Sequence, residues 1–163
     1  KKISICEGTD TVINGLQPFG FEYKWNTGDT SSALKVYKPG LYILKYNTPC
    51  GYVTDSIIIN TIYCNIDYEI PNVFTPNKDD VNDLFTITLK NTKQINYKIF
   101  NRWGNEIKSE TITVNIFNSQ KITLWDGNIN ENIASNGTYF YLIELTPFKG
   151  ETIKLKGFFN LFY

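Results

Sequence analysis

The chain has 163 residues, enough for one ordinary domain or two small ones. Its 16 Lys and Arg residues balance 16 Asp and Glu residues, which argues against binding nucleic acid through phosphate contacts. Histidine is absent, and this removes the commonest general base and the commonest zinc ligand, so most hydrolase mechanisms are disfavoured.

Composition and turn spacing indicate the fold class. Aromatic residues make up 15% of the chain, and the abundant Tyr, Phe, Ile and Thr suit a pleated surface better than a helix. No apolar run approaches the length of a membrane-spanning helix, so we expect no direct membrane insertion. Turn signals recur about every 8 to 12 residues, as in β-sandwiches. The sequence therefore predicts an all-β fragment of a longer protein, with two Ig-like β-sandwich domains in tandem.

The first predicted domain covers residues 1–63. Turn signals such as Asn14-Gly15 and Lys38-Pro39-Gly40 separate short strands, which we expect near Thr11–Asn14, Phe21–Trp25, Ala33–Val36, Gly40–Tyr46 and Tyr52–Thr61. Phe21, Tyr23 and Trp25 alternate with charged residues, which predicts one buried and one solvated face. The run Ile57–Ile59 is expected in a strand of the partner sheet.

Three cysteines raise the question of a disulfide. A bridge between Cys6 and Cys50 would close a loop of about 45 residues and contribute about 4 kcal/mol, which suits a domain with little core. The alternative is two buried free thiols in a reducing compartment. Cys64 is then left over at the junction of the two domains, either free or paired with a partner outside the chain.

The second predicted domain covers residues 65–163 and has longer, more regular strands. Apolar residues alternate with threonines over Phe85–Leu89, Tyr97 and Ile99 alternate with Lys98 and Phe100, and a long strand follows at Tyr139–Leu145. The last strand is apolar on one face, and its other face becomes apolar at Phe158 and Phe162. This pattern predicts an Ig-like sandwich of about 100 residues.

A loop rich in Asp and Asn follows Pro76. Two prolines and many Asx residues exclude a strand interior, so residues 76–83 are expected to form an ordered loop. Its hard oxygen ligands are those that Ca²⁺ prefers, and the candidate metal ligands are Asn77, Asp79, Asp80, Asn82 and Asp83. The alternative is that these side chains cap turns by accepting hydrogen bonds from nearby backbone N–H groups.

Two further stretches contain tryptophan. Around Arg102-Trp103-Gly104 we expect a hairpin, and we favour a packed Trp103 over a cation–π pair or an exposed platform for a ligand. Trp125 is expected in the core, with turns at Asp126-Gly127 and Asn136-Gly137. The pattern Asn136-Gly137-Thr138 also fits a glycosylation acceptor, although turn chemistry explains it without a sugar.

Several of these motifs in series resemble a known family. They occur in the order Pro71-Asn72-Val73-Phe74-Thr75-Pro76-Asn77, Asp79-Asp80-Val81-Asn82-Asp83, Phe100-Asn101-Arg102-Trp103-Gly104, Trp125-Asp126-Gly127 and Asn136-Gly137-Thr138-Tyr139-Phe140-Tyr141. Residues 65–163 resemble the gliding-motility-associated C-terminal domain, the type B signal of the type IX secretion system of Bacteroidetes. Residues 1–63 are similar to the Ig-like or PKD-like repeats that precede this domain.

The resemblance implies a function in export. It implies that the chain ends a large secreted cell-surface adhesin, which crosses the outer membrane through the type IX translocon. It also implies contact with an outer-membrane protein of the PorP/SprF-like kind, and attachment at the cell surface. On this interpretation we expect neither nucleic-acid binding nor catalytic activity.

We expect a folded surface near the terminal strand to be recognised, either by pairing with a receptor strand or by seating its rings in a groove. The candidate partner-binding residues are Phe158, Phe159, Leu161, Phe162, Tyr163, Arg102 and Trp103. The alternative for the strand is a central position with both faces buried.

Two rival functions remain open. One is a calcium-dependent carbohydrate- or protein-binding adhesive module, with Arg102, Trp103 and Trp125 as a stacking platform. An enzyme using Asp79, Asp80 and Asp83 as carboxylate pairs is a distant third, because no nucleophile, base or pocket is identifiable.

Overall fold

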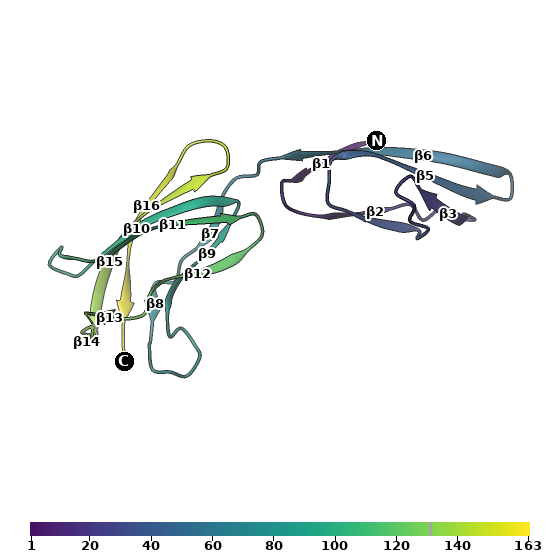
Figure 1. The fold of residues 1–163 in the computed structure, drawn as a ribbon. Coiled ribbons are helices and arrows are strands. Elements are labelled where there is room, and N and C mark those ends of the chain that lie inside the picture. The colour runs from purple at the N-terminus through teal and green to yellow at the C-terminus, as the bar shows by residue number, and fades with distance from the viewer. Residues whose placement is uncertain (131) are drawn as a thin grey trace. The chain divides into compact units, whose positions relative to one another are not determined.

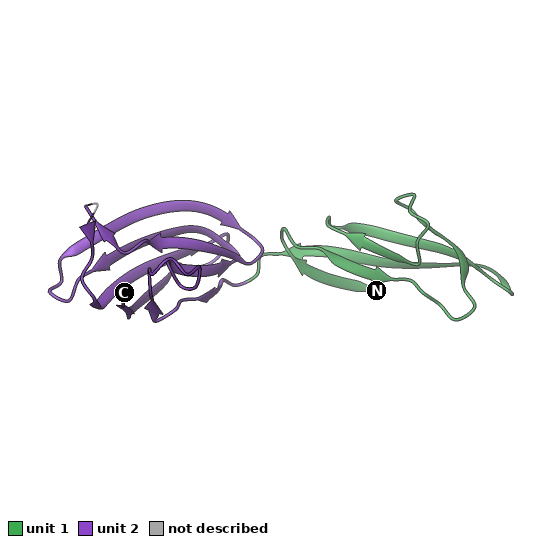
Figure 2. Cartoon of the chain, turned by 90° about the horizontal axis from the view of Figure 1, so that it is seen from below, with its two compact units in different colours: residues 1–64 green, residues 65–163 purple. Residues whose placement is uncertain are grey.

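The computed structural model describes residues 1–130 and 132–163 and divides the chain into two compact units. Unit 1 comprises Lys1–Cys64 and unit 2 comprises Asn65–Tyr163 (Figures 1 and 2). Every regular element of the described residues is a β-strand, which confirms the predicted all-β class. Accordingly, the described part of the chain contains no helix long and apolar enough to cross a membrane.

Unit 1 has a four-stranded sheet and a two-stranded sheet. The larger sheet has the order β1 (Lys2–Cys6), β6 (Gly51–Ile62), β5 (Gly40–Thr48) and β3 (Phe21–Trp25), and the smaller sheet pairs β2 (Thr11–Asn14) with β4 (Ala33–Val36). The sequence did not predict β1, which pairs parallel with β6. Nor does β6 lie in the partner sheet, because β5 pairs with both β6 and β3. Ile57–Ile59 and Trp25 therefore belong to one sheet.

The core of unit 1 is small. Trp25 is its largest side chain, and the Trp25 indole N–H donates to the carbonyl of Ser31 at 2.9 Å. The other buried apolar residues come from both sheets: Ile13, Leu34, Val36, Leu44, Tyr46 and Ile59. Phe21 is exposed, contrary to the predicted alternation, because Glu22 has a positive φ of 55° and the β3–β5 register shifts between Phe21 and Lys24.

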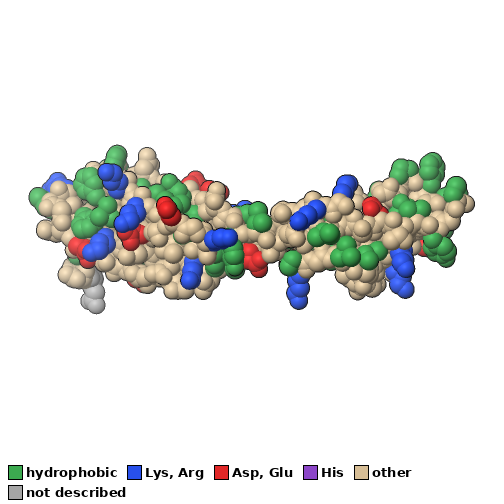
Figure 3. Space-filling view, turned by 90° about the horizontal axis from the view of Figure 1, so that it is seen from above, with side chains coloured by type: hydrophobic (Ala, Val, Ile, Leu, Met, Phe, Trp, Pro, Cys, Tyr) green, Lys and Arg blue, Asp and Glu red, His purple; other side chains and the backbone are tan. Residues whose placement is uncertain are grey.

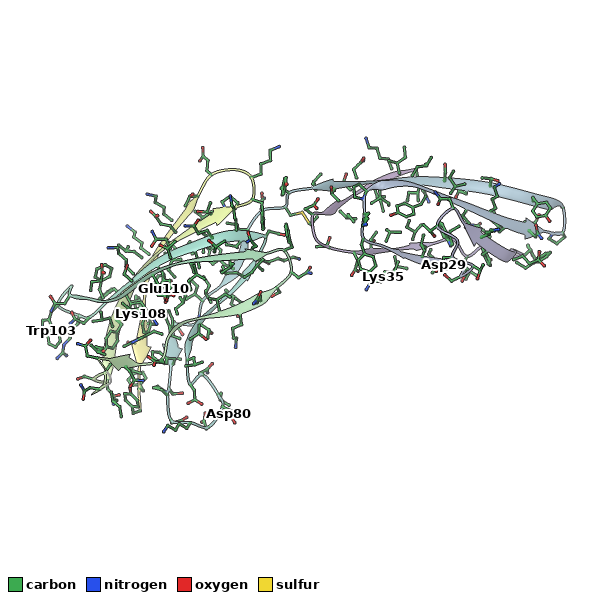
Figure 4. The ribbon with its side chains drawn as sticks, viewed as in Figure 1. Asp29, Lys35, Asp80, Trp103, Lys108 and Glu110 are labelled. Atoms are coloured by element: carbon green, nitrogen blue, oxygen red, sulfur yellow. A yellow bond between two sulfur atoms is a disulfide. The ribbon has the colours of Figure 1, made fainter. Side chains whose placement is uncertain are left out.

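A disulfide joins Cys6 to Cys64, with their Cα atoms 5.5 Å apart, so the predicted Cys6–Cys50 bridge is wrong (Figure 4). The topology explains the pairing. Because β1 runs parallel to β6 with Cys6 opposite Ile62, the end of β1 lies beside the end of β6. Cys50 lies in the turn that precedes β6, at the other end of that strand, and is a free, exposed thiol.

Unit 2 has two larger sheets. The order in the first is β11 (Glu106–Ile116), β10 (Thr92–Phe100), β15 (Gly137–Pro147), β16 (Ile153–Leu161) and β8 (Val73–Phe74). The second has the order β12 (Gln120–Trp125), β9 (Phe85–Lys90) and β7 (Asp67–Glu69). A short hairpin pairs β13 (Asn128–Ile129) with β14 (Asn132–Ile133).

Interlocking aromatic rings fill the core of unit 2. Phe85 from β9 stacks on Phe159 from β16 with ring centroids 3.8 Å apart. Phe159 also lies against Phe74, Trp125 and Tyr139. Trp125 is buried, as predicted, and its indole N–H donates to the carbonyl of Asn128 at 2.8 Å. These contacts join the two sheets, because their rings come from strands of both.

Candidate functional site: the outer face of the terminal strands

Three phenylalanines form a row across the solvent side of the five-stranded sheet. Phe100 on β10 is opposite Phe140 on β15, which in turn is opposite Phe158 on β16. Side chains alternate along a strand, so these residues point outward where their neighbours Ile99, Tyr139 and Phe159 point into the core. We call Phe100, Phe140, Leu142 and Phe158 the outer aromatic face.

The outer aromatic face exposes large apolar side chains to solvent. Phe140 is 44% exposed, Leu142 is 48% exposed and Phe158 is 56% exposed. Single exposed apolar side chains are common on proteins, but a contiguous group of them is typical of an interaction site. Figure 3 shows hydrophobic side chains beside Lys and Arg side chains on the surface of unit 2.

A shallow depression of about 510 Å³ lies over this face. The outer aromatic face lines it together with Arg102 and Lys156, and none of its described lining residues is acidic. Two nearby glutamates on the same sheet are neutralised, because Glu106 pairs with Lys98 at 2.8 Å and Glu144 pairs with Lys154 at 3.1 Å. Neither Arg102 nor Lys156 belongs to an ion pair among the described residues. The depression therefore has an apolar floor and an unneutralised positive rim.

The hairpin at one end of the face is held by Asn101. The Asn101 side-chain oxygen accepts hydrogen bonds from the backbone N–H groups of Trp103 and Asn105, both at 3.0 Å. The favoured interpretation of a packed tryptophan is wrong, because Trp103 is 70% exposed at the tip of the hairpin (Figure 4). Instead Arg102 lies 4.3 Å from the centroid of the Trp103 ring, a cation–π geometry.

The terminal strand is neither a free edge throughout nor buried on both faces. Phe159 and Leu161 have no exposed surface, so these two candidate partner-binding residues cannot contact a partner of the folded unit. Phe158, Phe162 and Tyr163 are about half exposed. The end of β16 also pairs with β8 at Asn160 and Leu161, so only the earlier part of the strand has an unpaired edge.

Polar contacts hold the last residues of the chain in place. The Asn136 side-chain oxygen accepts a hydrogen bond from the Tyr163 backbone N–H at 3.1 Å, and the Tyr163 hydroxyl donates to the carbonyl of Gly127 at 3.1 Å. The Thr138 hydroxyl donates to the Asn160 side-chain oxygen at 2.8 Å. The Asn136-Gly137-Thr138 segment thus has a structural role in positioning the end of β16.

The Asp- and Asn-rich loop forms through hydrogen bonds to its own backbone. The Asp83 carboxylate accepts hydrogen bonds from the N–H groups of Lys78 at 2.6 Å and Asp80 at 2.8 Å. Asp79 accepts from the Asn77 side chain and from the Val81 N–H, which lower the pKa of its carboxyl group. Asp80 is at the loop surface (Figure 4). This is the pattern of the capping alternative; calcium binding by Asn77, Asp79, Asp80, Asn82 and Asp83 remains a prediction.

Among the described residues, no group of three or more His, Cys, Asp or Glu side chains is placed so that it could hold a metal ion. Nor is the predicted Arg102–Trp103–Trp125 platform present, because Trp125 is buried in the core. Asp126, next to Trp125, serves a turn, and hydrogen bonds from Asn128 lower the pKa of its carboxyl group.

Sequence reasoning missed Phe100, Phe140, Leu142 and Lys156 as surface residues. The period-two pattern separates Phe140 and Leu142 from the buried Tyr139 and Ile143, but residues of both faces are apolar. An apolar residue at every position of a strand predicts burial on both faces. In this sheet one apolar face is left open to solvent.

The fold and the site define a class of protein: a tandem β-sandwich chain whose second unit presents an apolar surface with a positive rim. Residues 68–161 match the family CHU_C, described as a type IX secretion signal domain, and the chain belongs to this family. The match confirms the resemblance to a type IX signal found in the sequence, and an N-terminal β domain precedes the matched region. No curated protein sequence matches the chain significantly.

Solved structures give weaker similarities. Dimeric latent PorU from Porphyromonas gingivalis is 10% identical, with a TM-score of 0.38 over 86% of this chain and 14% of that one. The four N-terminal Ig domains of Dscam1 isoform 4.4 are 11% identical, with a TM-score of 0.30 over 99% of this chain and 42% of that one. SGBP-B of the Bacteroides ovatus mixed-linkage glucan utilization locus, in complex with a mixed-linkage heptasaccharide, is 16% identical, with a TM-score of 0.25 over 99% of this chain and 42% of that one. The chain spans between 14% and 42% of the length of these structures.

Proposed function

We propose that this chain is the C-terminal part of a large cell-surface adhesin, and that unit 2 is its signal for export and surface attachment. Family membership implies export across the outer membrane by the type IX system and interaction with the machinery of that system. The match of residues 68–161 to the secretion signal family is the observation that carries the proposal.

The finer parts of the proposal concern the mechanism. The signal acts by surface contact and without catalysis, and its receptor includes an outer-membrane protein of the PorP/SprF-like kind. Two features support recognition of a folded signal. The core residues Phe159 and Leu161 tie the end of the chain to the body of unit 2, and the neighbouring Phe158 is exposed. A receptor can therefore bind the terminal strand without unfolding it.

A reporter fusion tests this function. A reporter with an N-terminal signal peptide for the Sec route is placed before residues 1–163 in a type IX-competent cell, and a matched fusion carries residues 1–64 alone. We expect the longer fusion to become accessible to protease added outside the cells and the shorter one to stay in the periplasm. Retention of the longer fusion in the periplasm would contradict the proposal.

Deletion of the terminal strand is a poor test of recognition. Because Phe159 and Leu161 are core residues, deleting residues 152–163 also removes part of the fold. Exposed substitutions on a folded unit separate recognition from stability, since surface changes usually alter stability by less than about 0.5 kcal/mol.

Binding of a carbohydrate by an adhesive surface is a second candidate function, favoured by the exposed Trp103 ring and the Arg102 beside it. On a glycan array, the purified chain would bind a defined sugar and Trp103→Ala would lose that signal. Equal signals from the two proteins, or none from either, would refute a sugar site at this hairpin.

A further inference from the structure

We propose that the outer aromatic face of unit 2 binds an acidic segment of a protein of the export machinery, which inserts an apolar side chain between Phe140, Leu142 and Phe158. This inference rests on the proposed export function and names the surface and the chemistry of the partner. Two properties of the site support it: its apolar floor and its positive rim.

The apolar floor supplies affinity. Phe140, Leu142 and Phe158 lie next to one another across β15 and β16, because Phe140 is opposite Phe158 and Leu142 is opposite Lys156. Rings held on a regular sheet lose little freedom when a partner covers them, and buried aromatic residues with neighbouring arginines are the usual energetic centre of a protein interface. The depression over them has a volume of about 510 Å³, which is room for the side chain of a partner.

The positive rim selects the sign of the partner's charge. Arg102 and Lys156 line the depression without an acidic neighbour in its described lining. The two glutamates nearby are already paired with Lys98 and Lys154. A partner that carries Asp or Glu beside its apolar side chain would neutralise the positive charges of Arg102 and Lys156, whereas a basic partner would be repelled.

The same features disfavour the two other kinds of partner. A sugar needs many hydrogen-bonding groups for the hydroxyls that it removes from water, whereas Phe140, Leu142 and Phe158 offer none and leave only polar residues such as Asn101 in the lining. Docking on an anionic membrane takes clusters of about four to eight Lys or Arg residues. The depression offers two. A protein segment fits both the floor and the rim.

The first test measures export of the reporter fused to the full chain. Phe140→Ser combined with Phe158→Ser should lower the exported fraction at least about tenfold, as expected when a contact worth more than about 1.4 kcal/mol is lost. Ile133→Ser and Val81→Ser are matched controls, because both residues are exposed on other parts of unit 2. Unchanged thermal unfolding of the purified variants shows that the effect is not one of folding.

Charge variants test the acidic nature of the partner. Lys156→Glu and Arg102→Glu should each lower export severalfold, and Lys156→Arg should leave it within about twofold of the original, because the charge is kept. Export by Lys156→Glu and Arg102→Glu at the original level would refute an acidic partner.

A photoreactive benzoylphenylalanine in place of Phe158 identifies what covers the face during export. The cross-linked peptide, sequenced by mass spectrometry, should contain an apolar residue flanked by Asp or Glu. A basic peptide, or cross-links to lipid alone, would overturn the inference. So would binding of the purified chain to phosphatidylglycerol vesicles that is lost in the Phe140→Ser, Phe158→Ser variant.

The proposed function and this inference fail in different ways. If the unmodified fusion stays in the periplasm, the export function itself is refuted. If the unmodified fusion and the Phe140→Ser, Phe158→Ser variant are exported equally well, export stands and the outer aromatic face is not the surface that is recognised.

Discussion

The two units are stabilised in different ways. Among the described residues, the core cluster of unit 1 has 7 buried apolar residues and that of unit 2 has 16, although unit 1 has about two thirds as many residues as unit 2. Unit 1 adds the Cys6–Cys64 disulfide, whereas unit 2 relies on packed rings. The comparison agrees with a general rule: a domain too small to bury enough apolar surface gains stability from a covalent cross-link.

The largest expected effect comes from removing the central ring of unit 2. Phe159→Ala should destabilise unit 2 by about 5 kcal/mol, the upper end for such a change, because Phe159 contacts four other rings. Hydrogen-exchange mass spectrometry reports the two units separately and should show faster exchange in unit 2 alone. The adjacent Phe158→Ala, on the exposed face, is the matched control and should change stability by less than about 0.5 kcal/mol.

Removing the disulfide should destabilise unit 1 and leave unit 2 unchanged. The Cys6→Ser, Cys64→Ser variant should lose about 4 kcal/mol from unit 1, since the bridge spans 58 residues, and nothing from unit 2. Force spectroscopy between the chain ends should also show an additional extension of about 200 Å, because the closed loop can then be pulled out at about 3.4 Å per residue. Cys50→Ser should change neither quantity, because Cys50 is free; an equal effect of Cys50→Ser would contradict the pairing.

Replacing Gly157 of β16 by Ala should destabilise unit 2, although this substitution usually stabilises a strand. Replacing a strand Gly by Ala normally gains about 0.5 to 1 kcal/mol. At Gly157, however, the new Cβ would lie 2.6 Å from Cζ of Tyr141. Gly157→Ala should therefore destabilise unit 2 by about 2 kcal/mol in a urea titration.

The Tyr141→Ala background tests the cause of this effect. With the ring gone, Gly157→Ala should be neutral or stabilising. A loss of the same size in both backgrounds would show that Tyr141 is not the obstacle.

The sequence predicted what depends on local pattern. The five strands expected in unit 1 and the burial of Phe85, Ile87 and Leu89 follow from period-two alternation and turn residues, which need no knowledge of distant contacts. The pairing of Cys6 could not be predicted in this way, because it depends on the parallel pairing of β1 with β6. The strand β1 itself was missed.

The site was harder to predict than the fold. Phe158 was expected at a partner surface and is exposed, but the adjacent Phe159 was expected there too and is in the core. Trp103 and Trp125 were assigned from similar local contexts, yet one is exposed and the other buried. An apolar residue does not reveal whether a second sheet covers it, so the open face of β15 and β16 became visible only in the three-dimensional structure.

The smallest expected effect concerns a buried hydroxyl of unit 2 and its response to alkali. The Tyr97 hydroxyl oxygen lies 2.9 Å from both the Glu110 carboxylate and the Leu124 carbonyl oxygen. Burial, together with the hydrogen bond to Glu110 and its negative charge, raises the pKa of Tyr97. Tyr97→Phe removes the hydroxyl and should cost about 1.5 kcal/mol at pH 7.

The sign of the pH dependence follows from the raised pKa of Tyr97. An unfolded tyrosine ionises near pH 10, whereas the folded chain holds the Tyr97 proton to higher pH. The folded state then binds more protons than the unfolded state, so the contribution of Tyr97 is complete below about pH 10 and declines above it. Urea titrations between pH 8 and pH 11 should show a steeper loss of stability for the original chain than for Tyr97→Phe, because the other tyrosines are common to both. Parallel curves would show that Tyr97 ionises equally easily in both states, and that its burial next to Glu110 does not disfavour the phenolate.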